Sequence, residues 1–125
     1  MNVVDSSAWL EYFAAGRHAG RFAAAIEASE ELLVPSVVLL EVTRRVLQQR
    51  GEDAALQAAA LLHQGEVIAL DSGLALTAAR LGVEHKLPLA DSIILATAQQ
   101  FNATLWTMDG DFEGLPNVRY VAKDK

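Results

Sequence analysis

The stretch LPLADSIILATAQQFNATLWTMDGDF, residues 87–112, joins an apolar helix-like run to an apolar strand-like run. Asp91 lies at the front of the helix-like run, and Asp109 directly follows the strand-like run TLWTM. A carboxylate in such surroundings is costly unless it is hydrogen-bonded, paired or bound to a cation. These two acids therefore suggest a binding site at the end of a buried strand.

Strand-like and helix-like runs alternate along the rest of the chain. Strands are predicted at 2–5, 32–35, 66–70, 104–108 and 117–121. Helices are predicted within 6–16, 17–31, 36–51, 52–65, 71–86 and 90–102, with Ser36 and either Asp71 or Ser72 as N-caps and with Gly16 and Gly51 as stops. Short strands separated by helices imply a mostly parallel sheet that helices cover on both faces.

The expected fold is therefore α/β, with about five short strands in a single domain. A chain of 125 residues is long enough for one hydrophobic core and too short for two. We expect this domain to span residues 1–122 and residues 123–125 to form a loose tail.

Composition narrows the class of protein. Apolar residues make up 52% of the chain, and the absence of cysteine excludes disulfides, thiolate metal sites and cysteine nucleophiles. Neither a signal peptide nor a membrane span is predicted, so we expect a soluble, cytoplasmic protein. The net charge of -6, from 10 basic and 16 acidic residues, disfavours a nucleic-acid partner unless several acids belong to one metal site.

Four acids are expected at one edge of this sheet. Asp5 and Asp109 follow strands, Glu41 lies early in a helix that follows a strand, and Asp91 opens a helix. Ligands of open parallel sheets gather at the carboxyl ends of the strands, where these acids would converge. Four crowded carboxylates need a cation or raised pKa values, and an all-oxygen set favours Mg²⁺ or Mn²⁺ over zinc.

Such a metal site suits phosphodiester hydrolysis. Mg²⁺ or Mn²⁺ with open coordination positions lowers the pKa of an attacking water and stabilises a leaving oxygen, so no protein nucleophile is required. The neighbouring hydroxyls of Ser7 and Thr107 are positioned in the sequence to orient these acids.

Four motifs, in this order, resemble those of PIN-domain ribonucleases, specifically VapC-like toxins of toxin–antitoxin pairs. They are VVDSSAWLEYF (3–13), VVLLEVTRR (37–45), LPLADSIILATA (87–98) and LWTMDGDF (105–112). The resemblance covers nearly the whole chain and implies a three-layer α/β/α PIN-like domain. It also implies an acidic quartet of Asp5, Glu41, Asp91 and Asp109, with Asp111 as a possible fifth acid near the metal and with Ser7 and Thr107 at hydroxyl positions of the family.

The resemblance further implies an activity and partners. The activity is a Mg²⁺- or Mn²⁺-dependent endoribonuclease that cleaves structured RNA. The partners are a second copy of the chain and an antitoxin whose tail covers the active site, in a heterotetramer or larger assembly that contacts DNA only through the antitoxin. Met108 and Gly110 stand where relatives often carry basic residues.

Each acid also has a simpler structural interpretation. Asp5 and Asp91 could be helix N-caps worth about 1 kcal/mol each, Glu41 could be a solvated helix residue, and Asp109 could begin a turn. The joint pattern argues against this, because Asp91 and Glu41 interrupt apolar helix faces. Asp71, by contrast, is interpreted as a cap, and Asp111 fits a turn or an outer ligand.

Other functional residues have weaker sequence support. Phosphate contacts are predicted for Arg17, Arg21, Arg44 and Lys86. The three histidines, His18, His63 and His85, show no metal-ligand spacing and are expected at the surface. An aromatic group, Trp9, Tyr12, Phe13 and Phe22, is expected to contribute mainly to the core and partly to a groove for a partner helix.

Three other classes of protein share parts of this pattern. Haloacid-dehalogenase-like phosphatases need a second acid where this chain has Ser7, and the adhesion-type motif D-x-S-x-S needs a serine where it has Trp9. A receiver-like α/β domain that binds Mg²⁺ without catalysis is the main alternative function. It expects paired acids at the first strand and a lysine after the last, which NVVDSS and NVRYVAKDK match poorly.

Overall fold

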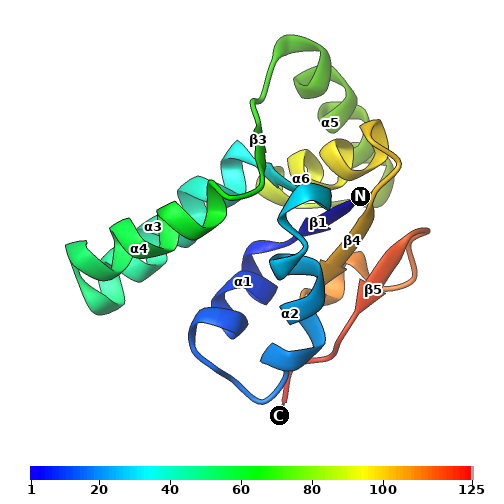
Figure 1. The fold of residues 1–125 in the computed structure, drawn as a ribbon. Coiled ribbons are helices and arrows are strands. Elements are labelled where there is room, and N and C mark those ends of the chain that lie inside the picture. Colours follow the sequence, from blue (N-terminus) through cyan, green and yellow to red (C-terminus); the bar gives the residue numbers. More distant parts are fainter. Residues whose placement is uncertain (125) are drawn as a thin grey trace.

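The computed structural model describes residues 1–124 and arranges them as a five-stranded sheet flanked by helices (Figure 1). In chain order the elements are β1 (Asn2–Val4), α1 (Ser6–Phe13), α2 (Ala19–Glu27), the 3-10 turn η1 (Ser29–Glu31), β2 (Leu32–Pro35), α3 (Ser36–Arg50), α4 (Glu52–Leu62), β3 (Glu66–Ile68), α5 (Ser72–His85), α6 (Leu89–Gln100), β4 (Thr104–Thr107), the 3-10 turn η2 (Gly110–Phe112) and β5 (Val118–Tyr120).

The sheet has the strand order β3-β2-β1-β4-β5, and every pair of neighbours is parallel. The α/β fold class with five short strands is therefore confirmed, and the sheet is parallel throughout. The order places the first strand beside the fourth, although about 100 residues separate them in the chain. The carboxyl ends of β1 and β4, which precede Asp5 and Asp109, thus lie side by side.

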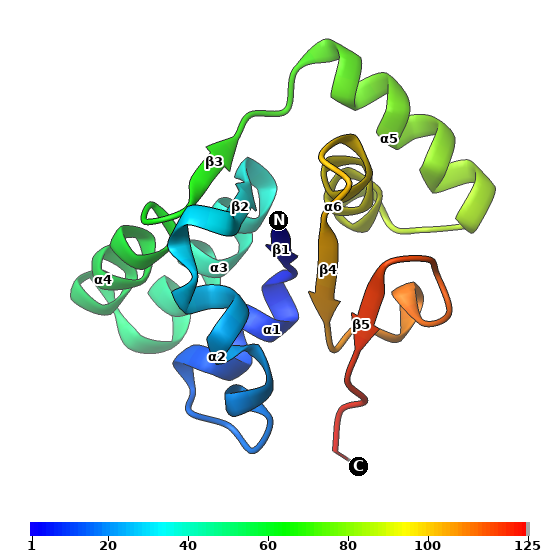
Figure 2. The same ribbon diagram turned by 45° about the vertical axis from the view of Figure 1, so that its right-hand side comes forward.

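Helices form a layer on each face of the sheet, as the three-layer expectation requires. α1 and α2 pack on one face, whereas α6 packs on the other with α5 against its outer side (Figure 2). Strand residues are buried because both faces are covered: all four residues of β2 are buried, as are Val3 and Val4 of β1.

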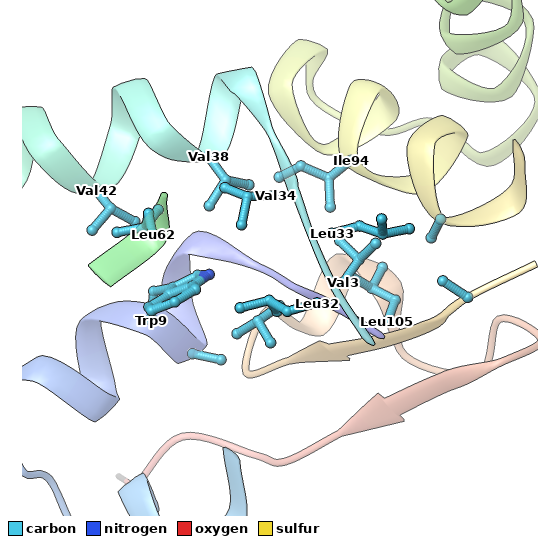
Figure 3. Close-up of a cluster of buried hydrophobic side chains, with 14 of the residues drawn as sticks. Val3, Trp9, Leu32, Leu33, Val34, Val38, Val42, Leu62, Ile94 and Leu105 are labelled. Carbon is cyan, nitrogen blue, oxygen red and sulfur yellow. The ribbon is translucent and has the colours of Figure 1, made fainter. Parts of the chain in front are cut away.

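The core joins the sheet to both helical layers. Figure 3 shows Val38 and Ile94 lying over strand residues such as Val34, while Trp9 reaches inward from α1. Complete burial of an aliphatic side chain contributes about 1.5–3 kcal/mol. The rigid layers that carry the acids are held together by these contacts.

A helical hairpin of α3 and α4 projects from the body of the molecule (Figure 1). Gly51 ends α3 with φ of 87°, a left-handed conformation that glycine adopts without a β-carbon clash. The predicted stop at Gly51 is confirmed. The N-cap predicted at Ser36 is wrong, because Pro35 occupies the cap position and Ser36 is already the first helical residue.

Other element ends differ slightly from the sequence prediction. α1 ends at Phe13 rather than near Gly16, and Ala15 takes a left-handed φ of 51° in the following turn. The helix predicted within 17–31 splits into α2 and η1. The cap predicted at Asp71 is confirmed, since its Oδ1 accepts a hydrogen bond of 2.8 Å from the Leu74 amide.

The aromatic group of the first two helices is divided between core and surface. Trp9 and Phe22 are fully buried, whereas Tyr12 and Phe13 are half-buried. The Trp9 and Phe13 rings stack with centroids 5.6 Å apart. Trp9 and Phe22 therefore belong to the core, and Tyr12 and Phe13 pack against it, while the groove for a partner helix stays a prediction.

The predicted tail is partly attached to the domain. Asp124 Oδ1 lies 3.0 Å from His18 Nε2 and 3.5 Å from Arg17 Nη1, so Asp124 is not loose, while Lys125 lies outside the described residues. The domain end at residue 122 stays a prediction.

Among the histidines, His63 is exposed as expected, but His18 and His85 are half-buried. No helix in residues 1–124 combines the length and apolar character that crossing a membrane requires.

Candidate metal centre

Three carboxylates converge at the carboxyl edge of the sheet. Asp91 comes from the first turn of α6, and Asp109 and Asp111 come from the turn after β4. One carboxylate oxygen from each lies within 4.8 Å of the others. Asp91 and Asp109 are half-buried, while Asp111 is exposed, so the group opens to solvent on one side.

Asp5 lies beside this group and is held by hydroxyls. The side chain is 3% exposed, and its Oδ2 accepts hydrogen bonds of 2.7 Å from Ser7 Oγ and 2.8 Å from Thr107 Oγ1. Its backbone amide donates to the Trp106 carbonyl at 2.8 Å, which ties the end of β1 to β4. Asp5 occupies the N-cap position of α1, yet its side chain makes no capping bond. The carboxylate therefore points toward the acids and not into the helix end.

The same two hydroxyls connect Asp5 to the loop that carries Asp109. Thr107 Oγ1 accepts a hydrogen bond from the Asp109 amide at 2.9 Å, and Ser7 Oγ accepts one from the Met108 amide at 3.0 Å. Each hydroxyl thus donates its only proton to Asp5 and uses its oxygen to fix the loop. The position of one acid constrains the position of the next.

Asp109 also shapes its own turn. Its Oδ1 accepts from the Asp111 amide at 2.9 Å and caps η2. The turn interpretation of Asp109 is correct as far as it goes, and it brings Asp111 into the group. Asp91, in contrast, makes no capping bond, because the N-cap position of α6 is Pro88.

Burial and neighbouring charges raise the pKa values of the two more enclosed acids, Asp91 and Asp5. Burial raises the pKa of Asp91 to about 8, with further contributions from a hydrogen bond to Asp109 and from the charges of Asp109, Asp5 and Asp111. Burial also raises the pKa of Asp5, against the opposing effect of the Ser7 and Thr107 hydrogen bonds. Without a cation, the acids can share this space only if a proton neutralises part of their charge.

Glu41 stands apart from the three-carboxylate group. It is half-buried in α3, and its Oε1 accepts a hydrogen bond of 2.7 Å from Ser6 Oγ. Ser6 directly follows Asp5, so Glu41 is linked to the site through the start of α1. Sequence reasoning missed this role of Ser6; the serine pair after Asp5 was the available signal, and only its second member was selected.

A basic cleft of about 460 Å³ lies beside Glu41, between α1 and α3. Its lining residues are Ser6, Ser7, Leu10, Glu41, Arg44, Arg45, Gln48 and Lys123. Arg44 was predicted as a phosphate contact and lies here, while Arg45 and Lys123 add two cations. The cleft therefore offers positive charge next to Glu41 and next to Ser7, the hydrogen-bond partner of Asp5.

The other predicted cations lie elsewhere. Arg17 pairs with Asp124 at 3.5 Å. Lys86 is exposed in the left-handed C-cap of α5, with φ of 56°. Arg21 lines a separate groove next to β5. The structure thus brings Arg44 to the edge of the acidic site, and it places Arg17, Lys86 and Arg21 in surroundings of their own.

The donor set fits a hard divalent cation. The ligand atoms of the group are carboxylate oxygens, which Mg²⁺ and Mn²⁺ prefer, and neither histidine nor cysteine is among them. Burial and the neighbouring acids raise the pKa of Asp91, so its charged form needs a compensating positive charge. Mg²⁺ or Mn²⁺ would supply that charge and leave the exposed side open to water and substrate.

Comparison with known proteins agrees with this geometry. The PIN-domain family matches residues 3–117. A solved toxin–antitoxin complex from Klebsiella pneumoniae is 28% identical, with a TM-score of 0.79 over 95% of this chain and 96% of that chain. No curated protein sequence matches the chain.

Two more distant structures share the fold. VapC20 from Mycobacterium tuberculosis, described as a sarcin-ricin loop cleaving toxin, is 24% identical, with a TM-score of 0.78 over 95% of this chain and 99% of that chain. VapBC2 from Rickettsia felis, solved with a promoter DNA fragment, is 18% identical, with a TM-score of 0.75 over 98% of both chains. Because the family match covers most of its length, the chain belongs to the PIN-domain family, and its structural neighbours include VapC toxin proteins.

Proposed function

We propose that the protein is a Mg²⁺- or Mn²⁺-dependent endoribonuclease and the toxin of a toxin–antitoxin pair. The observation that carries the proposal is the convergence of Asp91, Asp109 and Asp111 within 4.8 Å at the strand ends, with Asp5 beside them. Membership of the PIN-domain family supports a nuclease, and it disfavours the receiver-like alternative. The solved neighbours that are toxin–antitoxin complexes support the toxin role.

The residues have distinct tasks in this proposal. Asp91, Asp109 and Asp111 bind the cation, and Asp5 completes the negative environment in an orientation fixed by Ser7 and Thr107. When bound, Mg²⁺ or Mn²⁺ lowers the pKa of an attacking water and stabilises charge on the scissile phosphate. Glu41, held by Ser6, would accept a hydrogen bond or proton at the edge of the basic cleft.

The basic cleft gives the RNA backbone a place to bind. Arg44, Arg45 and Lys123 surround a space next to Glu41 that can accept phosphates by charge-assisted hydrogen bonds. An acidic chain of net charge -6 needs such a local concentration of cations to approach RNA. Arg17 and Lys86 are weaker candidates for phosphate contact, because one is paired and the other lies in a helix cap.

The proposal includes partners. We infer an antitoxin protein whose basic tail binds over the acids, a homodimer of this chain, and a larger complex in which the antitoxin contacts DNA. The solved complexes from Klebsiella pneumoniae and Rickettsia felis support an antitoxin partner. The cytoplasmic location stays a prediction.

A cleavage assay tests the activity directly. The protein is incubated with structured RNA and Mn²⁺, with and without EDTA, alongside Asp5→Asn and Asp91→Asn. We expect cleavage by the wild type only when metal is present, and a loss of at least about 100-fold in both variants. Asp71→Asn is the matched control, because this exposed acid caps a helix and asparagine caps equally well.

Two results would contradict the proposal. One is cleavage that persists in EDTA, and the other is full activity in both site variants.

The toxin role has a separate test in bacterial growth: expression of the wild type should slow growth, and expression of Asp91→Asn should not. Equal growth would reject the toxin role but leave the nuclease intact.

A further inference from the structure

A second groove lies at the edge of the sheet, away from the basic cleft. Its volume is about 560 Å³, and its lining residues are Arg21, Trp106, Val118, Arg119, Tyr120 and Val121. β5 is the last strand in the sheet order, so one side of the groove is a sheet edge. Sequence motifs pointed to Arg21 alone among these residues.

The groove presents an indole next to a guanidinium. Trp106 and Arg119 are register partners on the parallel strands β4 and β5, so both side chains leave the same face of the sheet. The Trp106 indole N–H donates to Asn2 Oδ1 at 2.9 Å, which fixes the orientation of the ring. The ring is half-buried, and the remaining part of it faces the groove.

Among residues 1–124, Arg21 and Arg119 have no acidic partner. Arg21 and Arg119 are exposed, and within residues 1–124 neither lies within 4.0 Å of a carboxylate oxygen, since the ion pairs there involve Arg17, His18 and His85. In a chain with a net charge of -6, two unpaired guanidiniums around one groove favour an anionic ligand. Guanidinium groups bind phosphates through paired hydrogen bonds.

The groove and the acidic site share strand β4. Trp106 precedes Thr107, whose hydroxyl donates to Asp5, and the Trp106 carbonyl accepts from the Asp5 amide at 2.8 Å. Val121 lines the groove, and its amide donates to the Thr107 carbonyl at 2.9 Å. Because the Trp106 and Thr107 side chains leave opposite faces of the sheet, a polyanion that contacts both sites would pass around the carboxyl ends of β4 and β5.

We propose that this groove, given the nuclease function above, binds a single-stranded nucleotide of the RNA substrate next to the cleaved bond. The base would stack on the Trp106 indole, and Arg21 and Arg119 would bind the flanking phosphates. Aromatic stacking with nearby cations is the usual basis for binding single-stranded nucleic acid, and it tolerates any base. The groove thus makes an unpaired flanking nucleotide part of the substrate requirement.

Tryptophan fluorescence gives a direct test, because Trp9 is fully buried and Trp106 is the only partly exposed indole. A short single-stranded RNA is titrated into the metal-free protein in EDTA, and binding is followed by fluorescence and by anisotropy of labelled RNA. We expect quenching in the wild type and a rise in Kd of about 5-fold or more for Trp106→Leu. Trp106→Phe should retain binding while losing the quenching signal.

The two arginines are tested by the salt dependence of RNA affinity. A structural defect would not change this dependence systematically. Arg21→Gln and Arg119→Gln should each raise Kd and reduce the slope of log Kd against log salt by about 0.7. Arg50→Gln is the control, because Arg50 ends α3 at the tip of the projecting hairpin, far from β5 (Figure 1). Circular dichroism verifies that each variant is folded, and the arginine variants keep the test decisive if Trp106→Leu does not fold.

The outcomes separate this inference from the nuclease proposal. Metal-dependent cleavage with Kd and KM unchanged in the Trp106 and arginine variants would overturn the groove and leave the nuclease. Quenching and salt effects without cleavage would support the groove and reject the nuclease. A failure of the RNA to bind the wild type would overturn the proposed role of the groove. Quenching of Trp106 by an eight-residue polyglutamate peptide with equal affinity would also overturn it, and would assign the groove to an acidic protein segment.

Discussion

Similar side chains have different environments in this protein. Asp71 is exposed and caps a helix, Asp5 is buried under two hydroxyl donors, and Asp91 is crowded by other acids. The sequence distinguished Asp71 from the others because Asp71 lies outside the four motifs that resemble those of PIN-domain ribonucleases. It could not rank the acids by proximity: Asp111 lies within the tight group, while Glu41 lies apart from it. That ranking depends on the η2 turn, which Asp109 caps locally and which the bond from the Met108 amide to Ser7 Oγ attaches to the start of α1.

The pH dependence of stability should report the environment of Asp91. Without metal, the folded protein holds a proton on Asp91 up to a pKa of about 8, whereas the unfolded chain loses it near the ordinary value of 3.8. The free energy of unfolding should therefore fall as the pH rises through this window, since the native state binds more protons. We expect a loss on the order of 1–3 kcal/mol, because partial exposure screens the effect.

Urea unfolding in EDTA from pH 5 to pH 9 measures this effect. Asp91→Asn keeps the shape of the side chain without its charge, so its stability should change less with pH than that of the wild type. The difference between the two curves removes contributions from groups that both proteins share. Parallel curves would show that the folded protein does not raise the pKa of Asp91.

The hydroxyl of Thr107 should matter for metal binding beyond its effect on stability. Thr107→Val removes a donor to buried Asp5 and an acceptor for the Asp109 amide, at a cost of about 1–3 kcal/mol in unfolding free energy. Loss of such an orienting group should weaken Mn²⁺ affinity by about 10- to 100-fold.

Thr97→Val is the matched control for this change. Thr97 is also fully buried, but its hydroxyl donates to the Ile93 carbonyl within α6 and touches none of the acids. This variant should lose stability and keep its Mn²⁺ affinity, as measured by calorimetric titration. Equal affinities for the two valine variants would mean that Thr107 contributes only to folding.

Elements were predictable where a local signal determines them. The five strands were recognised by short apolar runs, and Gly51 and Asp71 by the turn and cap that these residue types favour. Element ends were less predictable where tertiary contacts override local preference. Ser36 is a good cap residue, yet β2 continues directly into α3 and leaves Pro35 in the cap position.

The contribution of the Asp71 cap to α5 is measurable. Asp71→Ala removes the hydrogen bond to the Leu74 amide and should lower the free energy of unfolding by about 1 kcal/mol. RNA cleavage should be unaffected, because Asp71 is exposed at the start of α5 and lies outside the acidic group. Denaturant unfolding and the cleavage assay check the two parts, and a large loss of activity would give Asp71 a role in the site.

At the scale of the whole molecule, the strand order creates the site. The neighbouring positions of β1 and β4 bring Asp5 to Asp109 from opposite ends of the chain, and α6 adds Asp91 from the covering layer. Acids at strand ends made this convergence predictable, since parallel strands present their carboxyl ends at one edge. The groove at β5 was not predictable, because Trp106 and Arg119 become neighbours only through strand register.

Calorimetric titration of Mn²⁺ tests most directly whether these acids need a divalent cation. In buffers of different ionisation enthalpy at pH 7, the wild type should bind Mn²⁺ saturably and release about one proton per ion, because Asp91 with a pKa of about 8 gives up its proton to the metal. Proton release should fall in Asp91→Asn, together with most of the affinity. An absence of saturable binding, or binding without proton release, would contradict the account.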